Sequence, residues 1–369
     1  MSSKKTVLIL VNKETTIIQF RLEVVKALVD EGYRVVVSTP VGDRISEIQG
    51  VGAEIVNTKI NKDGTNPLQD LVLINDYRKV IKKIKPDIVL TYTVKPNVYG
   101  GIAAAMSRVP YVANITGLGT ALGNKGLMQK VILVLYKIGF CKIKKVFFQN
   151  SENMQFFADH KIAVGKYELL PGSGVNLQRF KKVEYPANDT IHFAFISRLK
   201  EEKGVYQYID TAKEIGKKYS NVVFHICGYG DEDLVSKVRE LDALGIVVYH
   251  GFLNDPRIIL KDVHCVIHPT YYPEGMSNVL LESAATGRAI ISTDRPGCRE
   301  TIDDGINGYI VREKDSADLI EKVESFMKLS YEEKKQMGLA GREKVEREFD
   351  RNIVVNRYLE TVRELTQRN

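Results

Sequence analysis

The chain has 369 residues, of which 44% are hydrophobic and 27% charged, a composition typical of a soluble globular protein with room for two domains. It excludes helical membrane spans, because no apolar run reaches the roughly eighteen residues that such a helix needs, and the first residues lack a signal-peptide pattern. The four cysteines are scattered without metal-ligand spacing, so we expect reduced thiols, a cytoplasmic location and no zinc site.

The net charge of +7 is unevenly distributed along the chain. Residues 1–180 hold 25 lysines and arginines against 14 acidic residues, whereas residues 181–369 hold 28 against 32. No acidic residue occurs from Ile88 to Ser151. This imbalance indicates an anionic partner for the N-terminal half, either a phosphate-bearing substrate, a membrane surface or a nucleic acid. Nucleic acid is the least favoured, because the basic window lacks interleaved aromatic residues and any known reader motif.

Apolar runs alternate with amphipathic stretches in the N-terminal half, and this pattern predicts a parallel sheet covered by helices on both faces. The expected strands are residues 6–11, 34–38, 87–91, 111–115, 146–149 and 167–170. The expected helices are residues 18–30, 71–84, 98–107, 127–140 and 152–160. We therefore assign residues 1–175 to a first Rossmann-like domain.

The alternation restarts after turn-rich residues that begin at Pro171, where we expect the linker. The expected strands are residues 192–196, 222–227, 247–250, 264–268 and 289–293, and the main helices are 205–218, 231–243, 278–287 and two within 331–366. The second Rossmann-like domain is then 188–350, and 351–369 is a helix that returns to the first domain. Two doubly wound α/β domains that face each other across a cleft fit this pattern, with ligands beyond the carboxyl ends of the strands.

The stretch from Glu274 to Glu282 is the most informative part of the chain. It follows an apolar run at 264–268 and a turn at 269–273, which predicts a strand, a turn and then a helix. Side chains on a helix lean toward its N-terminus, so Glu282 can point toward the same site entrance as Glu274. The helix N-terminus between them offers free N–H groups and a positive dipole end. Two acceptors around a ring of donors suit a ligand with hydroxyls and phosphate, such as a nucleotide sugar.

Charged or glycine-containing turns follow other strands of the C-terminal half. Arg198 and Lys203 both reach the expected cleft, where a diphosphate leaving group needs fixed cations. A solvated charged loop is the alternative for these two residues. The turn with Gly228 is weaker evidence, because tight turns use glycine in any case. The turn with Phe252 and Leu253 can present its backbone to a base, and a turn without a binding role is the alternative.

Polar residues also follow strands of the N-terminal half, where an acceptor can dock. Lys95 is favoured as functional because it lies in the acid-free window, whereas helix capping is an equally supported role for Asn97. Thr116 and Gly117 follow the next strand. Thr16 lies after the first strand, which runs into no Gly-x-Gly-x-x-Gly turn, so a dinucleotide site is disfavoured. No Walker pattern or metal-ligand cluster occurs, and we predict no catalytic metal and no cofactor.

The expected helix at 127–140 carries Lys130 and Lys137 seven residues apart among apolar residues. It is too short to span a bilayer but can lie on an anionic surface with its lysines at the headgroups. Packing in the domain core is the favoured alternative for its apolar residues. The lysines at 142, 144 and 145 favour a membrane nearby.

These motifs resemble a known family, the retaining glycosyltransferases of the GT-B fold, family 4, over essentially the whole chain. The Glu-x7-Glu pattern of Glu274 and Glu282 carries the resemblance, together with Arg198 and Lys203 in an Arg-x-x-x-x-Lys-Gly element. The resemblance implies that Arg198 and Lys203 bind the diphosphate of the donor and that Glu282 holds its ribose hydroxyls. It also implies that Glu274 contacts the donor sugar. The residues that it places around the sugar and the phosphate are Gly275, Met276, Ser277 and Asn278.

A narrower resemblance links the same stretch, with Lys95, Asn97, Thr116 and Gly117, to bacterial enzymes that build capsule, exopolysaccharide or O-antigen units on an undecaprenyl-diphosphate carrier. It implies a cytoplasmic enzyme at the inner face of the plasma membrane, with the Lys125–Lys145 region at the headgroups. The chain departs from many relatives by lacking a glycine-rich first loop and by having Val94 in place of a histidine. Whether Lys95 or Asn97 replaces that histidine stays open.

The resulting hypothesis is a retaining, metal-independent hexosyltransferase that moves a hexose or N-acetylhexosamine from a UDP-sugar to an undecaprenyl-diphosphate-linked acceptor. A sugar-nucleotide epimerase or hydrolase of the same fold is an alternative, and it predicts turnover of the donor alone. A non-catalytic nucleotide-sugar-binding subunit is a second alternative, and it predicts UDP binding without transfer.

Overall fold

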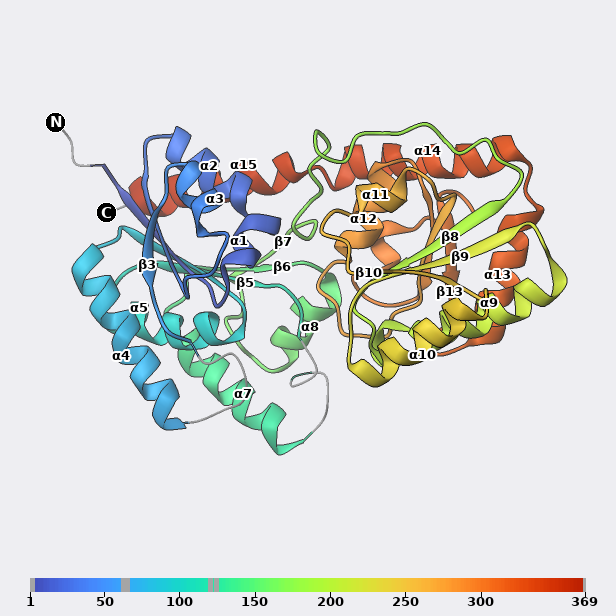
Figure 1. Cartoon of the computed structure of the whole chain (residues 1–369). Helices are drawn as coiled ribbons and strands as arrows, with labels where there is room; N and C mark the ends of the chain where they lie inside the picture. The colour runs from blue at the N-terminus through green and yellow to red at the C-terminus, as the bar shows by residue number, and fades with distance from the viewer. Residues whose placement is uncertain (1–3, 61–66, 119–121, 123–125, 368–369) are drawn as a thin grey trace. The chain divides into compact units, whose positions relative to one another are not determined.

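The computed structural model describes residues 4–60, 67–118, 122 and 126–367 (Figure 1). The chain divides into two compact units. The first unit is Met1–Ser173 with Asn352–Asn369, and the second unit is Gly174–Arg351.

The first unit is built on a seven-stranded parallel sheet in the order β3-β2-β1-β4-β5-β6-β7. Its inner strands are apolar and buried along their whole length, as parallel sheets covered on both faces require. The strands are β1 (Thr6–Leu10), β2 (Arg34–Thr39), β3 (Glu54–Asn57), β4 (Ile88–Tyr92), β5 (Tyr111–Ile115), β6 (Lys145–Phe148) and β7 (Tyr167–Leu169).

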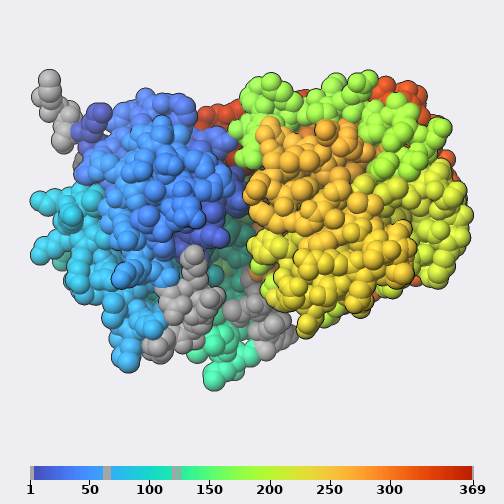
Figure 2. Space-filling view, in the orientation of Figure 1, coloured from blue at the N-terminus to red at the C-terminus, as the bar shows by residue number. Residues whose placement is uncertain are grey.

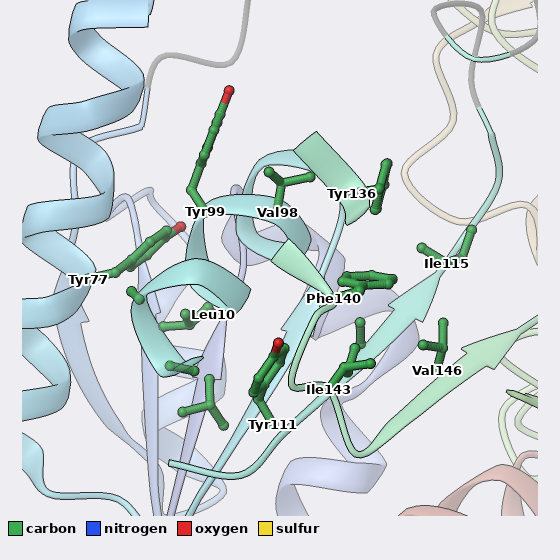
Figure 3. Packing of buried hydrophobic residues seen from close by; sticks show 14 of the residues in the cluster. Leu10, Tyr77, Val98, Tyr99, Tyr111, Ile115, Tyr136, Phe140, Ile143 and Val146 are labelled. Atoms are coloured by element: carbon green, nitrogen blue, oxygen red, sulfur yellow. The ribbon is translucent and has the colours of Figure 1, made fainter. Parts of the chain in front are cut away.

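Helices cover both faces of this sheet because successive strand residues point to opposite sides. On one face lie α1 (Glu14–Phe20), α2 (Leu22–Asp30), α3 (Ile45–Gly50) and α15 (Arg351–Gln367). On the other lie α4 (Pro67–Ile84), the π-helical turn η1 (Pro96–Gly100), α5 (Gly101–Met106), α7 (Leu127–Gly139) and α8 (Ser151–Asp159). The second face is rich in aromatic rings, including Tyr77, Tyr99, Tyr111, Tyr136 and Phe140 (Figure 3).

The C-terminal helix α15 belongs to the first unit from Asn352 onward, as expected from the sequence. Tyr358 of α15 accepts a hydrogen bond of 2.9 Å from the side chain of Asn114 at the end of β5. Arg357 and Arg363 of the same helix form ion pairs with Glu168 and Glu31. The last helix therefore closes one face of the N-terminal sheet.

The second unit is built on a six-stranded parallel sheet in the order β10-β9-β8-β11-β12-β13. The strands are β8 (Ile191–Ile196), β9 (Val222–Cys227), β10 (Val248–Gly251), β11 (Cys265–His268), β12 (Ala289–Thr293) and β13 (Gly308–Val311). One face carries α9 (Val205–Lys218), α10 (Glu232–Ala243) and α13 (Ser316–Lys328). The other carries α11 (Arg257–Leu260), α12 (Asn278–Ala285) and α14 (Tyr331–Glu348). The expectation of two doubly wound units is confirmed.

The strand order reverses between β1 and β4 in the first unit and between β8 and β11 in the second. Ligands of doubly wound sheets bind beyond the carboxyl ends of the strands at this switch point. In the second unit the switch point joins the turn after β8, which holds Arg198, to the turn after β11, which holds Glu274.

Two expectations about the elements need correction. The single helix expected at 18–30 is wrong, since the backbone breaks at Arg21 and forms α1 and α2. The strand β3 and the helix α3 were not expected, and they add an edge strand to the first sheet.

Candidate functional site

A lysine, a glutamate and a histidine meet at the switch point of the second unit. Lys203 ends a short 3₁₀ turn, η2 (Glu201–Lys203), and its ammonium group forms an ion pair with Oε1 of Glu274. Nε2 of His268, the last residue of β11, lies 3.9 Å from the same oxygen. Lys203 is only 7% exposed and His268 only 2%. The sequence prediction that Lys203 and Glu274 lie at one site is therefore compatible with the geometry, whereas His268 was not singled out.

The charges of this centre are fixed at neutral pH. Burial raises the pKa of the Glu274 carboxyl, but the adjacent His268 ring and the charge of Lys203 outweigh it and lower the pKa to about 2. Burial lowers the pKa of His268, so its imidazole is neutral. Glu274 is therefore a permanent carboxylate.

Tyr272 links the two predicted diphosphate-binding cations. The ammonium group of Lys203 lies 4.6 Å from the centre of the Tyr272 ring, within the range of a cation–π contact. Burial and the charge of Glu274 raise the pKa of Tyr272, and Arg198 opposes this rise. Arg198 itself is exposed directly after β8. An exposed arginine beside a lysine held on an aromatic face suits an anion that arrives from solvent.

Two glycines allow the turns of this centre to approach one another. Gly204 has φ of +77°, and a Cβ atom there would lie 2.0 Å from the carbonyl oxygen of Pro269. Gly297 has φ of +85°, and a Cβ atom there would lie 2.5 Å from the carbonyl oxygen of Gly275. The backbone carbonyl of Gly297 also accepts a 2.7 Å hydrogen bond from Ser277 N–H. Glycine is thus required at both positions where these loops approach each other. The close packing of the loops holds Lys203 and Gly275 in place.

The predicted donor-binding segment lies at the N-terminus of α12. Gly275, Met276 and Ser277 are buried, and α12 begins at Asn278. The Ser277 side chain makes no capping hydrogen bond with the first turn of the helix. The N–H groups of a first helical turn have no partner within the helix and carry the positive end of its dipole, so this end of α12 suits an anion.

Glu282 lies one turn further along α12, and no side-chain hydrogen bond links it to another described residue. Burial raises the pKa of its carboxyl to about 7, although the charges of Arg179 and Arg351 oppose that rise. A half-buried carboxylate with no side-chain hydrogen bond inside the described protein is consistent with a ligand that brings hydroxyl donors, which is the role that the resemblance implies.

Gly228 and Phe252 lie at the neighbouring strand ends. A Cβ atom at Gly228 would lie 1.8 Å from the carbonyl oxygen of Ser197, so glycine is required for β8 and β9 to end side by side. Phe252 is 60% exposed and packs edge-on against Tyr229, with ring centres 5.4 Å apart. Leu253 is half-buried beside them. Two exposed rings offer a stacking surface, and Tyr229 was not among the predicted site residues.

In the first unit, Lys95 lies at the carboxyl end of β4 and is engaged with its own unit. Its ammonium nitrogen is 3.3 Å from Oδ1 of Asp70, whose other oxygen accepts a 2.7 Å hydrogen bond from the Tyr99 hydroxyl. Lys95 and Asp70 are both largely buried. Binding of an acceptor by Lys95 stays a prediction. An acceptor that binds the Lys95 ammonium group must share it with the Asp70 carboxylate or displace that carboxylate.

Asn97 is buried in the core of the first unit. Its amide donates 2.9 Å to the carbonyl of Asn114 and accepts 2.7 Å from the Thr91 hydroxyl. Both ends of the side chain are therefore used to join β4, β5 and η1, which is not the helix-cap role considered from the sequence. Its contact with an acceptor stays a prediction.

The remaining predicted acceptor residues lie at the surface or near it. Thr116 is exposed after β5, Gly117 is half-buried beside it, and Thr16 is half-buried in α1. Thr93, which the sequence analysis did not select, has φ of +70° and a buried hydroxyl without a hydrogen-bond partner. Strained non-glycine residues cluster at functional sites, so Thr93 joins the candidates at this strand end, next to the exposed Val94.

Within the described parts of the chain, no three His, Cys, Asp or Glu side chains are grouped as a metal site would require. No helix among the same residues is long and apolar enough to cross a membrane.

Comparison with known proteins identifies related sequences. The family model for glycosyl transferases group 1 matches residues 178–344, and the model for glycosyl transferase 4-like proteins matches residues 6–150. One similar protein is the N,N'-diacetylbacillosaminyl-diphospho-undecaprenol alpha-1,3-N-acetylgalactosaminyltransferase of Campylobacter jejuni, 27% identical, with 93% of this chain and 94% of the relative covered. The capsular polysaccharide biosynthesis glycosyltransferase CapM of Staphylococcus aureus is 26% identical, with 78% of this chain and 80% of the relative covered.

Solved structures share the fold at low sequence identity. A glycosyltransferase from Rickettsia africae superposes with a TM-score of 0.84 at 20% identity, covering 100% of both chains. HepE of Anabaena, solved in complex with UDP and glucose, superposes with a TM-score of 0.81 at 16% identity, covering 98% of this chain and 100% of that one.

Proposed function

The chain belongs to the glycosyltransferases, with a glycosyl transferase 4-like N-terminal part and a group 1 C-terminal part in the GT-B fold, and we propose that it moves a hexose or N-acetylhexosamine from a UDP-sugar to an undecaprenyl-diphosphate-linked acceptor. The transfer proceeds with retention at the anomeric carbon. It serves the synthesis of a capsule, an exopolysaccharide or an O-antigen.

The centre of Lys203, Glu274 and the α12 N-terminus is the observation that carries this proposal. A diphosphate leaving group gains negative charge in the transition state, and fixed cations and helix N–H groups stabilise that charge. Lys203 and Arg198 supply the cations, and α12 supplies the N–H groups. The permanent carboxylate of Glu274 is a hydrogen-bond acceptor for the hydroxyls of the donor sugar.

The proposed reaction is a front-face substitution without a metal. The departing β-phosphate helps to deprotonate the acceptor hydroxyl, so no carboxylate nucleophile is needed, unlike the double displacement of retaining glycosidases. Arg198 and Lys203 take the place of a metal ion at the diphosphate. Full activity after removal of divalent cations by a chelator supports this proposal, and restoration of a lost activity by one divalent cation contradicts it.

The acceptor is proposed to bind at the carboxyl ends of β4 and β5, where Lys95 and Thr116 lie. Two relatives act on lipid-linked acceptors, as their names state, and this supports a lipid-linked acceptor here. They are the Campylobacter enzyme above and the UDP-Gal:alpha-D-GlcNAc-diphosphoundecaprenol alpha-1,3-galactosyltransferase of Escherichia coli, which is 24% identical over 67% of this chain. The acid-free, lysine-rich window from Ile88 to Ser151 in this half of the sequence suits the diphosphate of such a carrier.

A donor and acceptor screen tests the function directly. The purified protein is incubated with UDP-, GDP- and dTDP-sugars and with a short polyprenyl-diphosphate-linked sugar, and the product is analysed by chromatography and by NMR of the new anomeric centre. Transfer from one UDP-sugar with retention is expected. Release of the sugar to water alone would instead identify a hydrolase. Binding of UDP without transfer to any acceptor would identify a non-catalytic subunit.

Replacing Glu282 by glutamine is expected to stabilise the protein at pH 8 while weakening donor binding. The folded pKa of about 7 lies above the ordinary value of 4.5, so the carboxylate destabilises the folded protein as pH rises through this window. The free energy of unfolding of Glu282→Gln should exceed the wild-type value by roughly 2–3 kcal/mol at pH 8. The difference should vanish near pH 4.5.

Urea unfolding followed by circular dichroism measures this difference, and Glu240→Gln, an exposed glutamate of α10, is the matched control. UDP affinity, measured by calorimetry, should fall about tenfold or more, because a charge-assisted hydrogen bond to the ribose is lost. Unchanged affinity for UDP would contradict the ribose assignment.

We also propose that the first unit contacts the inner face of the plasma membrane through α7. Atoms coloured for this part of the chain are visible at the surface of the unit in Figure 2. The expectation that the apolar residues of this helix pack in the core holds for one side only, with Ile132, Leu133 and Tyr136 buried. The opposite side exposes apolar residues at spacings of four, three and four, flanked by exposed Lys130 and Lys137. These apolar residues are Leu127, Val131, Val134 and Ile138. An apolar stripe beside lysines is typical of a helix that lies in a lipid interface.

The other lysines of the predicted membrane region are distributed differently. Lys125 lies outside the described residues, Lys145 pairs with Glu168, and Lys142 and Lys144 lie at the opposite end of α7 from Leu127. The exposed Leu71 and Val72 of α4 add apolar surface at the start of that helix. The proposed membrane-contacting surface therefore includes the outward side of α7 and the first two turns of α4.

The double variant Val131→Asp/Val134→Asp is expected to lose binding to anionic vesicles, because it places two carboxylates on the stripe that enters the lipid interface. Flotation with phosphatidylglycerol-containing vesicles measures the bound fraction, which should fall by about tenfold or more. Val164→Asp, on another exposed valine of the same unit, is the control. Equal binding by the double variant and the wild type would contradict the assignment of this surface.

A further inference from the structure

A cationic pocket lies at the amino ends of strands β5, β6 and β7 in the first unit. Its lining includes the four cations Arg108, Lys142, Lys144 and Lys166, and its volume is about 500 Å³. These residues lie in the turns that lead into the three strands. The predicted acceptor residues follow the carboxyl ends of β4 and β5, at the opposite edge of the sheet, so this pocket is a separate site.

The positive charge of this pocket is not compensated by the protein. No acidic residue lines it, and none of its four cationic side chains forms an ion pair within the described ranges of the chain. The neighbouring Lys145, in contrast, pairs with Glu168 at 2.8 Å. Like charges held together around one hollow repel each other, and a bound anion would relieve that repulsion.

The backbone that carries these cations is fixed by buried groups. Tyr111, which is 1% exposed, donates a 2.8 Å hydrogen bond to the carbonyl of Gly139 and accepts one of 3.3 Å from Lys142 N–H. Lys144 N–H donates to the carbonyl of Tyr111, and the carbonyl of Lys166 accepts from Val146 N–H. The three lysines therefore extend from positions that the sheet holds in place. Ile143, which also lines the pocket, belongs to the buried core of the unit (Figure 3).

A second cationic hollow continues this surface. It is lined by Arg78, Lys82 and Lys85 of α4 and the residues just after it, and it shares Val109 with the first pocket. Its volume is about 660 Å³. Ligand pockets usually measure about 300–1,000 Å³, and a single phosphate ion fills only a small part of such a space. The charge and the size together favour an anion with several phosphate groups.

We propose that the pocket lined by Arg108, Lys142, Lys144 and Lys166 binds an anion that carries two or more phosphate groups. This site is independent of the proposed transfer reaction, because none of its residues belongs to the donor centre or to the predicted acceptor site. The phosphates can come from a soluble polyphosphorylated compound or from clustered headgroups of anionic lipids. Both sources present the same chemistry to the lysines.

Calorimetry with inorganic tripolyphosphate and flotation with vesicles of phosphatidylglycerol or phosphatidylcholine test the two sources. The variant Lys144→Gln/Lys166→Gln removes two charges but keeps most of each side-chain length, and Lys328→Gln, an exposed lysine of α13, is the control. We expect the double variant to bind tripolyphosphate, or phosphatidylglycerol vesicles, about tenfold more weakly than the wild type. We expect the control to match the wild type.

A loss in the tripolyphosphate arm alone identifies a soluble ligand, and a loss in the vesicle arm alone identifies the lipid surface. Equal binding by the wild type and the double variant in both arms, or no binding by the wild type in either, overturns the proposal. Thermal unfolding of the double variant confirms that it is folded, and the milder variant Lys142→Gln repeats the test if it is not. Transfer activity of each variant is measured separately, so that failure of the anion site and failure of the proposed function are distinguished.

Discussion

Replacing Lys203 by alanine is expected to lower the turnover number about 10²–10³-fold, the range found when one group that stabilises transition-state charge is removed. The lysine is buried against Tyr272 and ion-paired with Glu274, so its ammonium group has a defined position before the donor binds. A preorganised cation stabilises the departing diphosphate without reorganising during the reaction. Steady-state kinetics with the correct UDP-sugar measures the effect.

The Lys203–Glu274 pair requires a second variant, because alanine at position 203 also leaves a buried carboxylate without its cation. Loss of one partner of a buried ion pair destabilises a protein by about 3–5 kcal/mol. The double variant Lys203→Ala/Glu274→Gln removes that uncompensated charge and should recover stability without recovering turnover. A near-normal rate in Lys203→Ala, or recovery of turnover in the double variant, would contradict the diphosphate role.

The sequence was sufficient to predict that the proposed donor residues lie at strand ends of the second sheet, because they follow apolar strands in a regular pattern. Arg198 and Glu274 each come directly after or near the end of a strand, and parallel strands bring such residues to one edge. His268 and Tyr272 were not predicted. His268 is the last residue of a buried strand and Tyr272 lies within a turn, and only the folded backbone shows that both side chains approach Lys203.

The contacts of the residues proposed to bind the acceptor were harder to predict, because burial decides the use of a polar side chain. Lys95 and Asn97 are two positions apart in sequence, yet Lys95 contacts a carboxylate and Asn97 joins two strands within the core. Neither Asp70 nor Asn114 is near them in sequence, so spacing gave no signal for these partners. The edge strand β3 was missed for a related reason, since its four residues are half-buried or exposed and lack an apolar run.

A row of four histidines crosses the second sheet, with His192 on β8, His225 on β9, His250 on β10 and His264 just before β11. Nδ1 of His192 lies 2.9 Å from Nε2 of His225, and Nδ1 of His225 lies 2.9 Å from Nε2 of His250. Nδ1 of His264 accepts a 3.1 Å hydrogen bond from His192 N–H. These contacts engage Nδ1 of His264 and both ring nitrogens of His225. A ring nitrogen that already takes part in such a contact is less available to bind an added proton.

These histidines are expected to make the second unit sensitive to acid. Burial is the main reason that the pKa values of His225 and His264 fall to about 4. Neighbouring imidazoles lower both values further, and Arg288 and Lys334 also lower the pKa of His264. The ordinary value is 6.5, so between pH 6.5 and pH 4 the unfolded chain binds protons that the folded chain does not. Stability is therefore lost as pH falls through this window, by roughly 3 kcal/mol for each group.

Urea unfolding followed by circular dichroism at pH 7 and pH 4.5 measures this loss in the wild type and in His225→Gln, which cannot take up the proton. The variant should lose less stability than the wild type between the two pH values, by about 2–3 kcal/mol. Glu282 acts in the opposite direction, because its raised pKa stabilises the folded protein as pH falls below 7. The difference between the variant and the wild type therefore isolates the histidine contribution, and parallel pH profiles for the two proteins would show that the row does not control acid stability.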